Sequence, residues 1–267
     1  MARSKFSTLM AFDRKTFAAE MGYAPAKPSA RSSRAVGDGQ LTLFNASYSY
    51  IIGVDEVGRG CLAGPVVAGA VMLPVIEARS ALATKLAGLD DSKVIPKAQR
   101  EELRDVIHSH AHACVAEATV AEIDQINILN ASLLAMKRAV HALLGRIPVP
   151  AEEILVLVDG NRNIKEFELK QKTVVQGDSH SASIAAASVF AKVHRDKLMA
   201  ELADKHPQYL WHQNKGYGSK AHRQALVEHG VTEWHRQSFR LFADSADRAD
   251  EEIEPDEIEN VELEITV

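Results

Sequence analysis

Apolar residues gather in five short runs between positions 48 and 175, and each run has the length of a β-strand. A glycine-rich turn separates the first two runs, so we expect them to pair as a hairpin. The fourth run has five consecutive apolar residues, which is typical of a strand covered on both faces. The expected strands cover residues 48–54, 65–73, 114–120, 154–158 and 173–175.

Three segments between and after these runs are expected to be helical. One begins near Pro96, because proline suits a first helical turn, and residues 130–144 repeat apolar side chains at helical spacing. A long helix covers residues 181–204 and ends before Pro207. The order of elements predicts an α/β fold, in which helices flank a mixed five-stranded sheet and a helical part follows it.

The composition is that of an ordinary water-soluble protein. Of the 267 residues, 46% are hydrophobic and 25% are charged, which excludes collagen-like and wholly disordered chains. Cys61 and Cys114 form no Cys-x-x-Cys pair, so neither a zinc site nor a redox motif is expected. Because no apolar run is long enough for a signal peptide or a membrane span, we expect a cytoplasmic protein.

The charge is distributed unevenly. Residues 244–267 hold 11 of the 36 acids and one of the 31 bases, which leaves 30 bases and 25 acids, or +5, on residues 1–243. A mildly basic body suits a polyanionic partner. We expect the acidic tail to be disordered, either without a role or folded back on the basic body. We expect residues 1–47, rich in Ala, Ser, Lys and Arg, to form a flexible arm, so that residues 48–243 are the folded domain.

Three acids follow directly on two of the predicted strands. Asp55 and Glu56 come after the first strand, and Asp159 comes after the fourth. Ligands of open α/β sheets bind beyond the carboxyl ends of strands, so this placement favours a functional site. Acids at strand ends also form turns, and Asp159 with Gly160 is a common turn dipeptide.

A fourth acid, Asp196, falls within a stripe of small and apolar residues on the predicted helix 181–204, and Arg195 falls outside it. A carboxylate that faces an interior needs a cationic partner. The partner is either a base, such as Lys192 or Lys93, or a divalent metal that Asp196 shares with the three strand-end acids. Such a set of carboxylates suits Mg²⁺ or Mn²⁺, and two of these ions support hydrolysis at phosphorus.

Several blocks of the sequence resemble the ribonuclease HII family, also called type 2 ribonuclease H. They are GVDEVGRGCLAGPVV (residues 53–67), LDDSK (89–93), VDGN (158–161), GDSHSASIAAASVFAKVHRD (177–196), KGYGSKAHRQALVEHG (215–230) and HRQSF (235–239). The resemblance implies a ribonuclease H fold and an endonuclease that cuts the RNA strand of RNA–DNA hybrids. It also implies nicking of duplex DNA at embedded ribonucleotides, with 3′-hydroxyl and 5′-phosphate ends. Cys61 and Ser219 depart from the usual proline and threonine of the family.

The resemblance also implies roles for individual residues. Asp55, Glu56, Asp159 and Asp196 match the family's four acids, which hold two divalent ions, Mn²⁺ or Mg²⁺. Gly58, Arg59 and Gly60 match a loop whose backbone contacts the ribose 2′-hydroxyl, and Tyr217 matches a tyrosine that stacks on the following deoxyribose; Lys93 is expected to contact a phosphate. Without the resemblance, Gly58 to Gly60 would be interpreted as a tight turn, and Tyr217 as a residue of a surface turn. The rival functions are a two-metal enzyme that acts only on DNA and a non-catalytic nucleic-acid adaptor.

One further motif lies in the expected arm. Gln40, Leu41, Leu43 and Phe44 resemble the Gln-Leu-x-Leu-Phe peptide with which bacterial repair proteins bind the sliding clamp. The alternative is that these apolar residues extend or pack against the first strand. We expect the protein to be a monomer that binds hybrids and ribonucleotide-containing duplexes.

Overall fold

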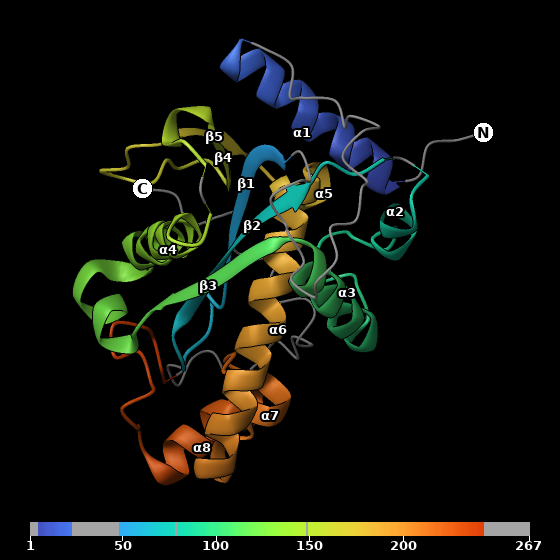
Figure 1. Ribbon diagram of the computed structural model, residues 1–267. Helices are drawn as coiled ribbons and strands as arrows, with labels where there is room; N and C mark the ends of the chain where they lie inside the picture. Colours follow the sequence, from blue (N-terminus) through green and yellow to red (C-terminus); the bar gives the residue numbers. More distant parts are fainter. Residues whose placement is uncertain (1–4, 23–47, 78, 148, 243–267) are drawn as a thin grey trace.

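The computed structural model describes residues 5–22, 48–77, 79–147 and 149–242, which form a five-stranded mixed sheet between helices (Figure 1). The strand order is β3-β2-β1-β4-β5. As predicted, the first two strands form an antiparallel hairpin; β3 is antiparallel to β2, whereas β4 and β5 run parallel to β1. The strands are β1 (Tyr48–Val57), β2 (Val66–Pro74), β3 (His112–Ala118), β4 (Leu155–Asp159) and β5 (Lys170–Val174).

Two long helices cover the two faces of the sheet, α4 (Val120–Leu144) on one side and α6 (Ala182–Lys205) on the other (Figure 1). Successive residues of β4 pack on opposite faces: Val156 belongs to the core under α4, and Leu157 packs with Ile184 of α6. This two-sided burial explains the uninterrupted apolar run that predicted the strand.

Helix α6 lies directly on the backbone of the hairpin. A Cβ atom added to Gly53 of β1 would lie 2.0 Å from the carbonyl carbon of Ser183, so any side chain there would push the helix away. The helix begins at the predicted place because the Ser181 side chain accepts a hydrogen bond from the Ile184 amide and caps it. The close approach fixes the position of α6 relative to the end of β1.

The helices differ from the predictions mainly at their ends. Helix α3 (Lys97–His110) begins directly after Pro96, as expected. Helix α4 begins ten residues before the predicted start, because Thr119 and Glu122 form a capping box. Asn127, with φ 65°, interrupts α4, so the helical spacing used for the prediction holds only beyond this break.

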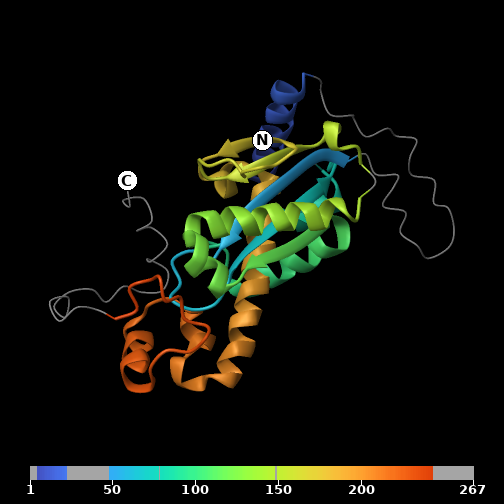
Figure 2. The ribbon, with the colours of Figure 1, turned by 90° about the vertical axis from the view of Figure 1, so that its left-hand side faces the viewer.

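The predicted helical part after the sheet consists of short elements packed around the end of α6. They are η3 (Pro207–Tyr209), α7 (Trp211–Asn214) and α8 (Lys220–His229), and they lie beyond one end of the sheet (Figure 2). Their core includes Leu62 from the loop between β1 and β2. The remaining elements are α2 (Ala81–Lys85), η2 (Ala151–Glu153) and α5 (Gly177–His180). Within the described ranges, no helix has the length and apolarity needed to cross a membrane.

The expectation of a flexible arm over residues 1–47 is wrong for its first part. Residues 5–21 form helix α1 (Lys5–Met21), which buries apolar side chains, among them Phe6 and Phe17, at helical spacing. Asp13 on the same face accepts hydrogen bonds from the amide and the hydroxyl of Ser183, at 2.9 and 2.8 Å, and so ties α1 to the start of α6. The expectation rested on the overall composition of residues 1–47, which does not show that residues 5–21 have an apolar helix face. Residues 23–47, which include the clamp-like motif, and residues 243–267 lie outside the described residues.

Replacing Phe17 by Ala tests whether α1 is part of the fold. Phe17 is fully buried against Ile51, Leu155 and Ile184, so we expect the free energy of unfolding to fall by about 3–5 kcal/mol. Urea unfolding of the full chain measures the change. Lys15→Ala, at an exposed position of the same helix, serves as the control and should change it by less than about 0.5 kcal/mol. Equal stability of the two variants would mean that α1 does not pack on the domain.

Candidate active site

A pocket of about 110 Å³ lies where β1 and β4 end, and it collects most of the predicted site residues. The two strands are parallel neighbours, so the acids at their carboxyl ends meet at the same edge of the sheet. Ser92 and Ser188 line the pocket as well. The predicted residues that line it are Asp55, Glu56, Gly58, Arg59, Gly60, Lys93, Asp159 and Tyr217.

A fourth carboxylate lines this pocket, and it is Asp178. This residue lies in the short helix α5, which follows β5, the parallel neighbour of β4. Burial, together with the nearby charges of Asp91 and Asp159, raises the pKa of Asp178 to about 6. The rule that picked out Asp55 and Asp159, acids just beyond parallel strands, applies to Asp178 too and would have found it.

The carboxyl groups of the pocket destabilise one another's charges. Burial raises the pKa of Asp55 well above its ordinary value, and the charges of Asp159, Glu56 and Asp178 raise it further. Burial also raises the pKa of Asp159, although hydrogen bonds from the Gly177 amide, at 2.6 Å, and from Asp55 oppose this effect. The pocket therefore holds more negative charge than its surroundings can stabilise.

Two buried serines support Asp55 from the helix side. A hydrogen bond from Ser188 of α6 lowers the pKa of Asp55 against the larger effect of burial, and the Ser188 hydroxyl lies 2.9 Å from that of Ser92. Ser92 follows Asp91 in the LDDSK block. The serines therefore orient the Asp55 carboxyl toward the pocket.

The chemistry of this donor set fits a divalent cation. All four groups are carboxylates, which are hard oxygen ligands, and their mutual repulsion is the charge imbalance that a cation removes. Among the described residues, no three acids, histidines or cysteines already surround a single point closely enough to hold an ion. Binding of an ion would therefore require the carboxylates to move toward it.

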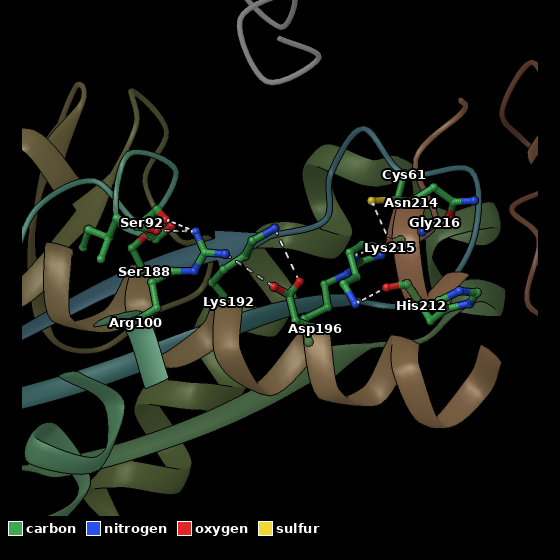
Figure 3. A network of polar contacts seen from close by, with 12 residues as sticks. Cys61, Ser92, Arg100, Ser188, Lys192, Asp196, His212, Asn214, Lys215 and Gly216 are labelled. Carbon is green, nitrogen blue, oxygen red and sulfur yellow. Dashed lines mark hydrogen bonds and ion pairs between the residues drawn. The ribbon is translucent and has the colours of Figure 1, made fainter. Parts of the chain in front are cut away.

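Asp196, the fourth predicted ligand, does not line the pocket. It lies on α6 eight residues beyond Ser188, about 12 Å along the helix. Its carboxylate lies 3.4 Å from the Lys192 ammonium and 4.0 Å from the Arg100 guanidinium (Figure 3). The ion pair with Lys192, which the sequence left open as the alternative, is the arrangement found, and the assignment of Asp196 to the carboxylate cluster is corrected.

The error came from the assignment of the buried face of α6. Residues 182–189 are buried on all sides of the helix, so their small side chains define no single face. Beyond them, Arg195 is completely buried, whereas Asp196 keeps part of its side chain exposed. The stripe argument had placed these two residues the other way round.

Two buried arginines hold the loop that contains Gly58, Arg59 and Gly60. Arg195 and Arg236 are both fully buried, and each donates three hydrogen bonds to backbone carbonyl groups. Arg195 binds the carbonyls of Pro65, Ala63 and Lys215, and Arg236 those of Gly64, Arg59 and Gly58, at 2.6–3.1 Å. Burial lowers the pKa of Arg236 to about 10, which leaves it protonated at neutral pH. The loop is therefore fixed by two side chains to which the sequence analysis assigned no role, although both lie in the blocks that resemble the family.

Gly58 is needed for this arrangement. Its φ is +92°, and a Cβ atom there would lie 2.1 Å from Nε of Arg195. Arg59, one residue on, forms an ion pair with Glu56 at 3.1 Å, which links the loop to the carboxylates. The loop thus presents its backbone at the pocket in one conformation.

Tyr217 reaches the pocket from the C-terminal part and is held through its backbone. Its carbonyl accepts a hydrogen bond from Nδ1 of His222 at 2.8 Å, and its amide donates one to the Asn214 carbonyl. Nε2 of His222 in turn lies 3.0 Å from Nε1 of Trp211 and 3.1 Å from Nε2 of His235. Burial lowers the pKa of both histidines, that of His235 to about 4, so the network is neutral at pH 7.

Comparison with known proteins gives one consistent result. The family model described as Ribonuclease HII matches residues 52–242. The ribonuclease HII of Ruegeria pomeroyi is 50% identical over 190 residues, which cover 71% of this chain and 76% of the relative. That of Magnetococcus marinus is 48% identical over 200 residues, which cover 75% of this chain and 89% of the relative.

Solved structures agree with the sequence relatives. Ribonuclease HII from Archaeoglobus fulgidus, solved in a complex with PCNA, is 25% identical with a TM-score of 0.57, over 74% of this chain and 98% of that one. The ribonuclease H2 of Pyrococcus horikoshii, 24% identical with a TM-score of 0.55 over 72% of this chain and 94% of that one, shares the fold.

Proposed function

Because the chain belongs to the ribonuclease HII family, we propose that its pocket of four carboxylates is the centre that cuts RNA. The chain is an endonuclease that hydrolyses the RNA strand of RNA–DNA hybrids. The observation that carries the assignment to this pocket is that Asp55, Glu56, Asp159 and Asp178 lie together beside a glycine loop. We extend the activity to duplex DNA that contains a single ribonucleotide, with 3′-hydroxyl and 5′-phosphate ends as products.

The enzyme depends on divalent metal, and we propose that these four carboxylates hold two ions, Mn²⁺ or Mg²⁺. Bound ions supply an activated water and neutralise charge on the leaving oxygen. In this proposal Asp178 replaces Asp196, which pairs with Lys192. The positive charge of a bound cation would oppose the effect of burial and lower the pKa of Asp55 and of Asp159.

The remaining pocket residues bind and orient the nucleic acid. The backbone of residues 58–60 lines the pocket, and Arg236 holds it through the carbonyls of Gly58 and Arg59, so it would form hydrogen bonds with a ribose 2′-hydroxyl of a bound strand. The Lys93 ammonium stabilises the carboxylate charges of Asp159 and Asp178 and is placed for a phosphate. Tyr217 provides a ring for the neighbouring sugar.

A panel of three duplexes tests the proposed function. We expect cleavage of an RNA–DNA hybrid and of duplex DNA with one ribonucleotide, and no cleavage of all-DNA duplex, in Mg²⁺ and in Mn²⁺. Denaturing gels measure the products. The Asp159→Asn variant should fold and bind hybrid but lose cleavage, because it removes one charge from the carboxylate set. Cleavage of all-DNA duplex would support a DNA nuclease, and binding without cleavage would support an adaptor.

We also propose that residues 40–44 bind a sliding clamp. The Archaeoglobus fulgidus ribonuclease HII was solved in a complex with PCNA, a sliding clamp, and the sequence of Gln40, Leu41, Leu43 and Phe44 resembles a clamp-binding peptide. The full chain should bind the bacterial clamp in a pull-down assay. Leu43→Ala with Phe44→Ala should abolish binding and leave hybrid cleavage unchanged. Equal binding by the double variant would contradict the proposal.

A further inference from the structure

A second cavity, of about 330 Å³, lies on a different side of α6 from the carboxylates. Phe190 and Lys197 line it from α6, Arg104 and His108 from α3, and Cys114 from β3. At 100° per residue, Phe190 and Lys197 are about 180–200° around the helix from Ser188, which faces Asp55. The cavity is therefore separate from the catalytic pocket.

The chemistry of this cavity is that of an anion site. Arg104, Arg146 and Lys197 line it with two histidines, and no carboxylate is among the described residues that line it. Nε of Arg104 is buried and has no hydrogen-bond partner in the described part of the chain, although its Nη1 lies 3.2 Å from Asp105. A ligand with several negative charges would satisfy these groups.

The cavity also borders the edge of the sheet. β3 is the last strand in the order β3-β2-β1-β4-β5, and among the described strands it pairs with β2 alone. Its residues Ala113, Cys114 and Val115 line the cavity. The outer edge of β3 has backbone amide and carbonyl groups that a further strand could bind, and basic side chains lie beside it. This combination suits an extended acidic peptide better than a small anion.

The same chain contains a segment that is both acidic, as the basic side chains require, and strand-like in sequence, as the edge of β3 requires. Residues 243–267 contain 11 acids and one base, and residues 261–267 read VELEITV, with alternation typical of a strand. Leu241 packs in one cluster with Met199 of α6, which lies about 200° around the helix from Lys197, so the segment starts on the other side of α6 from the cavity. Residues 243–260 can span about 60 Å when extended, enough to reach it.

We propose that residues 261–267 bind in this cavity as an additional strand on β3, with Glu262 and Glu264 facing Arg104, Arg146 and Lys197. The carboxylate pocket is lined by four acids, which would repel the same segment. The acidic segment thus binds away from the catalytic pocket and leaves it open to nucleic acid. This proposal does not depend on the proposed function.

Charge reversal with rescue in the full chain tests the proposal. Hydrogen exchange of the β3 amides is measured by mass spectrometry in low salt. We expect Glu262→Lys with Glu264→Lys to accelerate hydrogen exchange roughly tenfold at those β3 amides that point away from β2. Arg104→Glu with Lys197→Glu should accelerate exchange of the same amides to the same extent. The combination of all four changes should restore the slow exchange. Glu152→Lys with Glu228→Lys, two exposed positions with the same change in net charge, should leave it unaltered.

Each result decides for or against the proposal. Unchanged exchange after reversal of Glu262 and Glu264, or no recovery in the fourfold variant, would overturn it. Protection of β3 that arises only when an RNA–DNA duplex is added would assign the cavity to nucleic acid instead. Amides of β4 provide an internal reference, because loss of global stability would accelerate both strands.

Discussion

Asp178→Asn is expected to lower the rate of hybrid cleavage about a thousandfold, whereas Asp196→Asn should retain most of it. Asp178 lies in the carboxylate pocket, so its replacement removes a charge on which metal binding depends, and a loss of about 4 kcal/mol in transition-state stabilisation corresponds to that factor. Single-turnover cleavage of a labelled hybrid in saturating Mg²⁺ measures the rate. Calorimetric titration with Mn²⁺ should show weaker binding by the Asp178 variant.

Asp196→Asn is the matched control, since it makes the same chemical change on the same side of the domain. It breaks an ion pair with Lys192 whose two side chains are only 13% and 14% exposed, so we expect a loss of stability but no loss of a carboxylate from the pocket. A thousandfold loss in this variant, with full activity in Asp178→Asn, would reverse our assignment. A loss of cleavage in both variants would mean that the ion pair between Asp196 and Lys192 also orders the carboxylate pocket.

The second large effect is expected at Arg236. Arg236→Met removes three hydrogen bonds and leaves the carbonyls of Gly58, Arg59 and Gly64 buried without a donor. We expect the free energy of unfolding to fall by about 3 kcal/mol and cleavage to fall more than a hundredfold as the loop loses its conformation. Urea unfolding and cleavage rates measure the two effects.

Arg236→Lys separates charge from geometry. Lysine keeps the positive charge but cannot reach three carbonyls with a planar fork, so we expect it to behave almost like methionine. Arg79→Met, at an exposed position, controls for the loss of one arginine. If the lysine variant were as active as the wild type, charge alone would explain the role of Arg236.

The sequence predicted the sheet well because its strands have strong, local signals. Five consecutive apolar residues identify β4, and the glycine-rich turn identifies the hairpin of β1 and β2. The position of Asp55 and Asp159 near strand ends then predicted that the two acids lie close together. The carboxyl ends of parallel neighbouring strands lie at the same edge of the sheet, so this prediction needed no other part of the chain. These features need only the residues of one or two elements.

The errors concern features that depend on distant parts of the chain. Asp196 was misassigned because α6 leaves the sheet near Phe190 and packs on the C-terminal part, which changes its buried face. Arg195 and Arg236 form hydrogen bonds with backbone more than 100 residues away, and such contacts leave no periodic signal. Helix α1 was missed because its composition resembled a linker, although its apolar face packs on α6 and β1.

The continuity of α6 has a mechanical consequence. One regular helix of 24 residues, about 36 Å long, spans both the sheet and the C-terminal part, and its Arg195 joins the loop of residues 58–65 to Lys215. No hinge separates the carboxylates from Tyr217 along this path. The spacing between the carboxylate pocket and Tyr217 is therefore set by the fold itself, and under the proposed function a duplex has to adapt to this fixed distance when it binds.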